Sequence, residues 1–345
     1  MKTLLIASAF TLIGSCATTR YSEKIENLKN TIQVTDSLEI TRFAKTIKAD
    51  ELKTHLYTFA SHQFEGRKTG EPGQKTAANF LKDYYIAQQI ASPLEGSNYF
   101  QTVPESFLPT NIKASENILA YIKGTEKPEE VIIISAHLDH LGYKNNEVYN
   151  GADDNGSGTT ALMEMAQAFK IAENEGFSPK RSILFLHLTA EELGLYGARY
   201  YVNHPVFELH KTIANLNIDM IGRVDEKHEN NPDYLYLIGA DRISKELHFI
   251  SEKINNTLYQ INLDYTFNAE DDKNRYYFRS DHYLFAEQNI PVIFYFNGEH
   301  ADYHETTDTA DKINYPLLAR RTKLIFATAW YLANMDKPLI HNSQL

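Results

Sequence analysis

The sequence predicts an α/β protein: a three-layer sandwich with a mostly parallel central sheet and helices on both faces. The first observation is a set of four short, continuous apolar runs rich in β-branched or aromatic residues, which is typical of strands buried on both faces of a parallel sheet. The second is that helical patterns lie between these runs. The third is the lack of an internal repeat or low-complexity linker, which favours one catalytic domain over residues 41–335.

The expected strands are residues 131–134, 182–186, 213–218 and 291–296. One expected helix carries an apolar stripe in its 3.6-residue period, made of Leu162, Met165, Ala166 and Phe169. A second helix is expected to begin at Pro316, since proline suits the first turn, and aligns Leu318, Ile325, Ala329 and Leu332.

The bulk composition is that of a folded globular protein without nucleic-acid character. The 345 residues are 43% hydrophobic and 23% charged, enough for a buried core. The formal net charge is −11 and no basic run occurs, so nucleic acid is excluded as a main partner.

The first 16 residues have the pattern of a lipoprotein signal peptide. Lys2 precedes an apolar run at residues 4–13, which is too short to span a membrane, and the only cysteine, Cys16, follows Gly-Ser. This resembles a bacterial lipobox, which implies cleavage before Cys16 and lipidation of its thiol. A plain secretory signal is the alternative. We expect an exported protein of the bacterial cell envelope, attached to the membrane only through this lipid.

The remaining terminal segments are expected to be peripheral. Residues 17–40 are polar and rich in Thr, Lys and Glu, and are interpreted as a tether, and residues 336–345 as a tail. A single cysteine leaves no intramolecular disulfide, so the core must hold the fold together.

Residues with metal-binding or acid–base chemistry follow all four expected strands. In open α/β sheets, ligands bind beyond the carboxyl ends of the strands, so these side chains are expected to meet at one edge. In chain order they are His137, Asp139, His140, Asp153, Asp154, Glu191, Glu192, Asp219, Tyr303, His304 and Asp308.

Each motif alone has a structural explanation. Asp-Asp-Asn-Gly at 153–156 suits a turn or helix N-cap, and Thr189 with Glu192 fits a capping box. Five such motifs at one sheet edge are not explained in this way. Imidazole and carboxylate together suit zinc, and a pair of ions needs a carboxylate that reaches both.

Together, in this order, the motifs resemble the co-catalytic dizinc exopeptidases (clan MH) typified by secreted bacterial leucyl aminopeptidases. Glutamate carboxypeptidases and glutaminyl cyclases are their relatives. The similarity runs from Glu-Gly-Arg-Lys-Thr-Gly at 65–70 to the last helix. It implies a hydrolase with two zinc ions, other divalent metals remaining open, acting on peptides and most plausibly removing N-terminal residues.

The resemblance also assigns the metal ligands. It implies that Asp153 bridges both ions. His137 and Asp219 would complete one metal site. Glu192 and His304 would complete the other.

Further roles follow from the same resemblance. Glu191 would be the general base that takes a proton from the attacking water. Asp139 would orient the ring of His137, and Asp308 would orient the ring of His304.

Three finer features complete the comparison. The peptide bond between Asp153 and Asp154 is expected to be cis. Tyr303 matches a tyrosine that donates to the oxyanion in some relatives, and Arg279 matches an arginine that contacts substrate. Packing and a surface ion pair, respectively, are the structural alternatives for these two side chains.

Other functions remain to be weighed. A carboxypeptidase is one alternative. A glutaminyl cyclase, which works with a single zinc, is another, although His137 and Asp219 favour two metals. A non-catalytic binding protein is disfavoured because the motif set includes Glu191. Residues 221–279, which are acidic and tyrosine-rich, are expected to decide the substrate. The sequence does not determine the oligomeric state.

Overall fold

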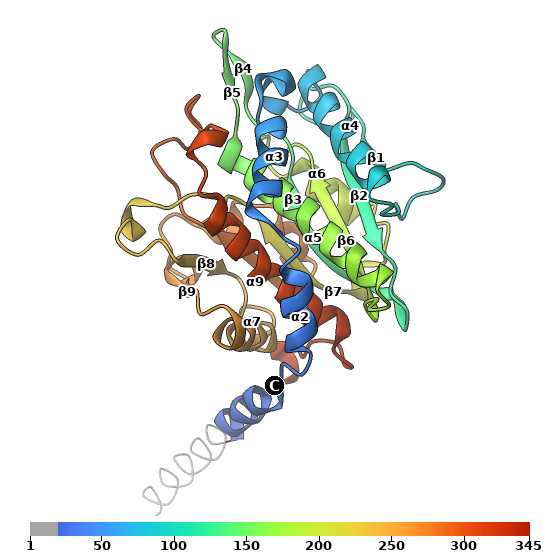
Figure 1. Ribbon diagram of the computed structural model, residues 1–345, viewed down its shortest axis with the longest axis vertical. Coiled ribbons are helices and arrows are strands. Elements are labelled where there is room, and N and C mark those ends of the chain that lie inside the picture. The colour runs from blue at the N-terminus through green and yellow to red at the C-terminus, as the bar shows by residue number, and fades with distance from the viewer. Residues whose placement is uncertain (1–19) are drawn as a thin grey trace, which may run out of the picture.

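The computed structural model describes residues 20–345. The protein is built around a central eight-stranded sheet (Figure 1). The strand order is β1-β2-β6-β3-β7-β10-β8-β9. Four of the seven strand pairs are parallel: β6–β3, β3–β7, β7–β10 and β8–β9. The strands are β1 Phe100–Val103, β2 Ser115–Ile122, β3 Lys127–His137, β6 Arg181–Leu188, β7 Thr212–Ile218, β8 Tyr234–Ile238, β9 Asn262–Asp264 and β10 Val292–Phe296.

The four strands expected from the sequence are the four central ones. They correspond to β3, β6, β7 and β10, which lie side by side in the order β6-β3-β7-β10 and run parallel. The mostly parallel sheet is thus confirmed. β2 and β8 flank these four strands, each antiparallel to its central neighbour, and β1 and β9 lie at the two edges of the sheet. A separate hairpin pairs β4 (Gly142–Lys144) with β5 (Glu147–Tyr149).

Helices cover both faces of the sheet, as the three-layer prediction requires. Side chains of β3 alternate between the faces: Ile132 and Ile134 join the larger core cluster, whereas Val131 and Ile133 join a second one. The larger cluster includes residues of α2 Ser37–Ala44, α3 Ala49–Phe59, α4 Pro72–Ala87, α5 Gly158–Asn174, α7 Lys245–Leu258 and α9 Tyr315–Asn334. The second includes residues of α6 Tyr196–Asn203 and α8 His282–Glu287.

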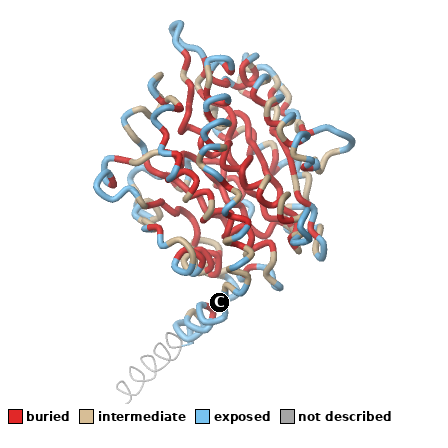
Figure 2. The backbone as a smooth tube through the Cα atoms, in the orientation of Figure 1, coloured by how far each residue is buried: buried red, intermediate tan, exposed pale blue. Residues whose placement is uncertain are grey.

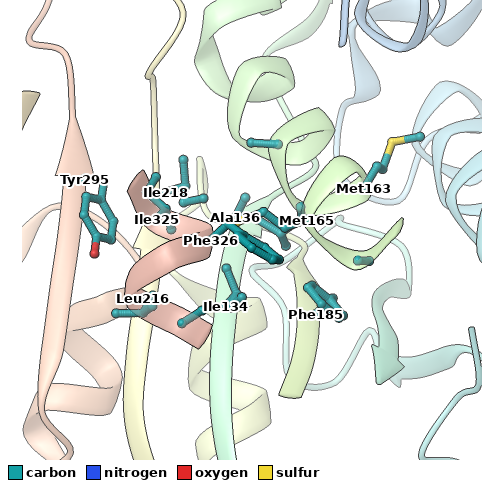
Figure 3. Packing of buried hydrophobic residues seen from close by; sticks show 14 of the residues in the cluster. Ile134, Ala136, Met163, Met165, Phe185, Leu216, Ile218, Tyr295, Ile325 and Phe326 are labelled. Atoms are coloured by element: carbon teal, nitrogen blue, oxygen red, sulfur yellow. The ribbon is translucent and has the colours of Figure 1, made fainter. Parts of the chain in front are cut away.

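The predicted helices α5 and α9 form the centre of the larger cluster. Met165 of α5 and Phe326 of α9 lie against the sheet side chains Ile134, Ala136 and Phe185 (Figure 3). Phe169 of α5 also contacts Phe326, with ring centroids 4.5 Å apart. Buried residues therefore fill the middle of the molecule, and exposed ones concentrate on the outer helices and loops (Figure 2).

The ends of the described chain are more structured than a tether and a tail. Residues 20–31 form a mostly exposed helix that projects from the body (Figure 1). The expected boundary at residue 40 falls inside α2, where Ile40 is buried, and Asp36 accepts a hydrogen bond from the indole of Trp330 at 2.6 Å. Leu339 in the C-terminal segment is also buried.

The expected signal peptide and Cys16 lie outside the described residues. Within residues 20–345, no helix combines the length and the apolar character needed to cross a membrane.

Candidate active site

Two groups of metal-binding side chains share Asp154 at the carboxyl edge of the sheet. In the first group, Nε2 of His137 lies 3.2 Å from Oδ1 of Asp154 and 3.2 Å from Oδ1 of Asp219. His137 is the last residue of β3, and Asp219 directly follows β7. Their ligand atoms lie within 4.8 Å of one another, close enough to surround one metal ion.

The second group lies on the other carboxylate oxygen of Asp154. Nε2 of His304, in the loop after β10, is 3.1 Å from Oδ2 of Asp154 and 3.3 Å from Oε2 of Glu192. Nδ1 of His140 is 2.8 Å from Oε1 of Glu192 and 3.7 Å from Oδ2 of Asp154. The ligand atoms of His140, Asp154 and Glu192 also lie within 4.8 Å of one another.

Asp154, and not Asp153 as expected, lies between the two groups and faces both. The two residues belong to an irregular π-helical turn, Ala152–Ser157, which leads into α5. The Asp153 carboxylate points the other way, accepting the N–H of Gly222 at 2.7 Å and facing Nε2 of His300 at 3.1 Å. The cis peptide bond is likewise shifted by one residue, to Asp154–Asn155.

Asp308 holds this turn rather than the ring of His304, which corrects the expectation from the resemblance. Its carboxylate accepts the backbone N–H groups of Asp153 at 3.0 Å and of Asp154 at 3.1 Å. The carboxylate therefore fixes the backbone that aims Asp154 between the two groups.

Asp139 contacts His137 mainly through its backbone. Its carbonyl oxygen lies 3.1 Å from Nδ1 of His137, whereas its carboxylate is 3.9 Å from that atom. The carboxylate instead accepts the hydroxyl of Thr69 at 2.8 Å and the N–H of Glu191 at 3.1 Å. The backbone carbonyl therefore contacts the imidazole, and the carboxylate holds the backbone of Glu191.

Asp219 ends a chain of buried polar side chains. Ser280 donates to its Oδ2 at 2.7 Å, and Asn217 donates to Ser280 at 2.9 Å. Ser135 in turn donates to Asn217 at 2.7 Å. These bonds leave Oδ1 of Asp219 directed at His137.

Arg67 anchors the two loops that supply ligands, a role that sequence analysis did not assign. Its side chain is fully buried and donates to the backbone carbonyls of Leu138 at 2.9 Å, Asn150 at 2.6 Å and Gly151 at 2.8 Å, and of Phe59 at 3.2 Å. Leu138 adjoins His137, and the 150–151 segment precedes the turn with Asp154. In the sequence, the only indication of this role is that Arg67 lies in the Glu-Gly-Arg-Lys-Thr-Gly motif at residues 65–70.

The electrostatics of the site fit divalent cations. Burial raises the pKa of the Glu191 carboxyl well above its usual range, and the neighbouring Asp219 and Glu192 carboxylates raise it further. Burial opposes protonation of His137, but Asp219 and Glu191 outweigh it and raise the pKa of that imidazole. Cations would relieve this crowding of buried carboxylates, and nitrogen and oxygen donors are those that zinc accepts.

A small pocket opens onto the first group. Its volume is about 40 Å³, and its polar wall includes His137, Asp154, Glu191, Asp219 and His304. The remaining wall is largely apolar or aromatic, formed by Met220, Tyr276, Phe294, Phe296 and Tyr303 together with Arg279, Ser280 and Glu299. The pocket therefore combines an apolar wall with a polar wall made of metal-binding residues.

Tyr303 and Arg279 both line this pocket. Burial raises the pKa of Tyr303, which keeps its hydroxyl protonated and able to donate. The Arg279 guanidinium lies 3.4 Å from the Tyr303 hydroxyl and forms an ion pair with Glu299 at 3.0 Å.

The structure therefore brings together most of the residues singled out in the sequence. His137, Glu191, Glu192, Asp219 and His304 meet at one place. Asp153 and Asp308 lie behind this cluster. His140 and His300 received no role from the sequence, although His140 stands in the His-Leu-Asp-His string and His300 is four residues before His304.

Comparison with known proteins gives the same picture. The chain is 30% identical over 262 residues to leupeptin-inactivating enzyme 1 of Streptomyces exfoliatus, covering 75% of this chain and 50% of that protein. It is 27% identical over 237 residues to aminopeptidase YwaD of Bacillus subtilis, covering 65% and 46%. The chain thus spans about half the length of these curated relatives.

A solved structure shares the fold. LapB from Legionella pneumophila superposes with a TM-score of 0.70 at 21% identity, over 90% of this chain and 81% of the other. The model of peptidase family M28 matches residues 117–329, which hold both donor groups. With this match over more than half of its length, the chain belongs to peptidase family M28.

Proposed function

We propose that this protein is a two-metal exopeptidase, most specifically an aminopeptidase that releases N-terminal residues from peptides. The observation that carries the proposal is the pair of donor groups sharing Asp154, with Glu191 beside the first group in the pocket. His137 and Asp219 would hold one ion with Asp154, and Glu192 and His304 would hold the other. Zinc suits these donors, and other divalent metals remain chemically acceptable.

The side chains supply the remaining chemistry. Bound metals would polarise the scissile carbonyl and make a water molecule more acidic. The Glu191 carboxylate accepts a proton from the attacking water and delivers it to the leaving amine. The Tyr303 hydroxyl donates to the oxygen that becomes negative as the carbonyl is attacked.

The charge of the pocket favours a free amine over a carboxylate. Arg279 is the one lysine or arginine among the pocket-lining side chains of residues 20–345, and Glu299 already pairs with it at 3.0 Å. No unpaired guanidinium or ammonium group in that lining can therefore receive a C-terminal carboxylate. The carboxyl groups of Glu191 and Glu299 place oxygen acceptors in the lining that suit a substrate ammonium group, and the apolar wall suits an apolar N-terminal side chain.

Metal content and hydrolysis test the proposal together. The purified protein is expected to hold about two zinc ions and to cleave amino-acid anilides. Glu191→Gln should retain the metal but lose at least about 100-fold in kcat, because the base is gone. Glu164→Gln, a carboxyl change in α5 away from the pocket, is the matched control and should keep the activity.

Each contrary result points to a specific alternative. Two metals without cleavage of free-amine substrates would support a carboxypeptidase. One bound metal, with His137→Ala tolerated, would support a cyclase that needs only the second group. Retained activity in Glu191→Gln would refute the assigned base.

We further propose that the exported protein is tethered by a lipid on Cys16. Metabolic labelling with a fatty-acid analogue should mark the wild type and leave Cys16→Ser unlabelled. Labelling of both proteins, or of neither, would contradict the tether.

A further inference from the structure

The second donor group contains one more donor than the first. Four side chains converge there: His304 and His140 approach Glu192 at 3.3 Å and 2.8 Å, and both face Oδ2 of Asp154. The first group has only His137, Asp154 and Asp219. We propose that His140 is a ligand of the same ion as Asp154, Glu192 and His304. The second site then has four protein ligands and the first has three, an inference that rests on the proposed two-metal function.

The surroundings of His140 support a ligand role. Its side chain is fully buried, and its Nε2 atom has no hydrogen-bond partner within the described part of the chain. The polar contacts of its ring are therefore those made by Nδ1, toward Glu192 and Asp154. A histidine kept only for packing would not need its Nδ1 atom directed at two carboxylates.

The backbone around His140 leaves little freedom for the ring. Its N–H donates to the carbonyl of Arg67 at 3.3 Å. The ring packs on Gly151, where an added Cβ would lie 2.5 Å from Cγ of His140 and where φ is +54°. Only glycine fits there easily, because an added Cβ would meet the Asp154 carbonyl oxygen at 2.1 Å as well as the imidazole of His140.

The pocket reaches the two groups unequally. All three residues of the first group line it together with Glu191, whereas of the second group only Asp154 and His304 do and His140 and Glu192 lie outside it. Zinc sites with four protein ligands are typically closed, and those with three keep a position for water or substrate. The open position therefore belongs to the first site, next to Glu191, and the second site binds its ion more tightly.

Cobalt substitution tests this assignment without any measurement of activity. The metal-free full chain is titrated with Co²⁺, whose visible absorption is strong in four-coordinate sites and weak when water raises the coordination number. The wild type should show a tight, strongly absorbing class and then a weaker second class. His140→Ala should weaken the tight class at least about 10-fold and reduce its absorption, leaving the other class unchanged.

His140→Asn separates a ligand from a hydrogen-bond donor. The asparagine amide can still donate to Glu192 from nearly the same position as Nδ1 but is a poor metal ligand. We expect His140→Asn to behave like His140→Ala. Wild-type affinity and absorption in His140→Asn would overturn the proposal and leave His140 as a positioning residue. His248→Ala, which removes a histidine 3.6 Å from Glu252 on α7, is the matched control.

X-ray absorption of the wild type gives an answer even where a variant fails to fold. With one equivalent of zinc, the tight site should show two imidazole ligands, from His140 and His304. One imidazole, or the absence of a tight class, would overturn the proposal. Failure of the proposed function would look different: two unequal classes with two imidazoles in the tight one, but no hydrolysis of any peptide.

Discussion

Replacing Arg67 by methionine should both destabilise the protein and loosen the metal site. The guanidinium donates four buried hydrogen bonds to backbone carbonyls, two of them in the segment just before the Asp154 turn. Burial lowers the pKa of Arg67 to about 10, which leaves it charged at neutral pH. Methionine has a similar length but leaves all four carbonyls without this donor.

The magnitude follows from the number of carbonyls. An unpaired buried polar group costs about 1–3 kcal/mol, so four of them set a range of roughly 4–12 kcal/mol. Such contributions are not additive and the loops can partly relax, so the lower end, about 4 kcal/mol, is the expected loss in free energy of unfolding. Because the freed loops adjoin His137 and Asp154, metal affinity should also fall about 10- to 100-fold.

Denaturant unfolding and metal titration measure the two effects separately. Arg181→Met is the matched control, since Arg181 is also fully buried and donates to backbone carbonyls, but near Leu332 and Met335. It should lower the free energy of unfolding while leaving metal affinity intact. Arg67→Lys should be intermediate, because an ammonium group lacks the planar fork. A loss below about 1 kcal/mol in Arg67→Met, or unchanged metal affinity, would refute the anchoring role.

Three further outcomes are expected. Asp154→Asn should abolish binding of both ions and reduce kcat/KM at least about 100-fold, whereas Asp153→Asn should retain two ions. If metal analysis finds two ions in Asp154→Asn and none in Asp153→Asn, Asp153 is the bridge. Burial raises the pKa of Glu164 to about 8, so the folded state binds more protons than the unfolded state between about pH 5 and 8 and stability falls as pH rises. The wild type should lose roughly 3 kcal/mol more than Glu164→Gln across that range in urea unfolding, and parallel pH profiles would contradict the buried carboxyl. Chelation should lower the melting temperature of both the wild type and Glu191→Gln. Added zinc should restore the melting temperature of both proteins but restore hydrolysis only in the wild type. An unchanged melting temperature after chelation would argue against metal binding in the folded state.

The sequence predicted the centre of the sheet because burial on both faces leaves a continuous apolar run. It did not predict β8, whose sequence Tyr-Leu-Tyr-Leu-Ile lies in the segment interpreted as a substrate loop. This segment is expected from the sequence to decide the substrate, yet Tyr234 and Tyr236 in it are buried. Their hydroxyls are satisfied inside the protein, by the Asn297 carbonyl and by the Asp225 carboxylate, partners that no local pattern reveals.

The site was predictable wherever a strand end fixes the direction of the side chain. His137 ends β3 and Asp219 follows β7, so the geometry of the parallel sheet places both at the same edge. His140 lies three residues beyond β3 in an irregular segment, where neither helical nor strand periodicity indicates its direction. Its position depends on Arg67 and Gly151, which are distant in sequence from Glu192.

The interchange of Asp153 and Asp154 has the same physical origin. In a regular helix or strand the spacing of residues decides which side chain faces the ligand, but the turn at 152–157 is neither. There the choice is made by groups about 150 residues later in the chain: His300 faces the carboxylate of Asp153, and Asp308 accepts the N–H groups of both aspartates. Because the Asp153 carboxylate contacts Gly222 and His300, it is Asp154 whose carboxylate faces both His137 and His304. The loop after β10 therefore contributes twice to the site, once through His304 and once by determining which aspartate is shared.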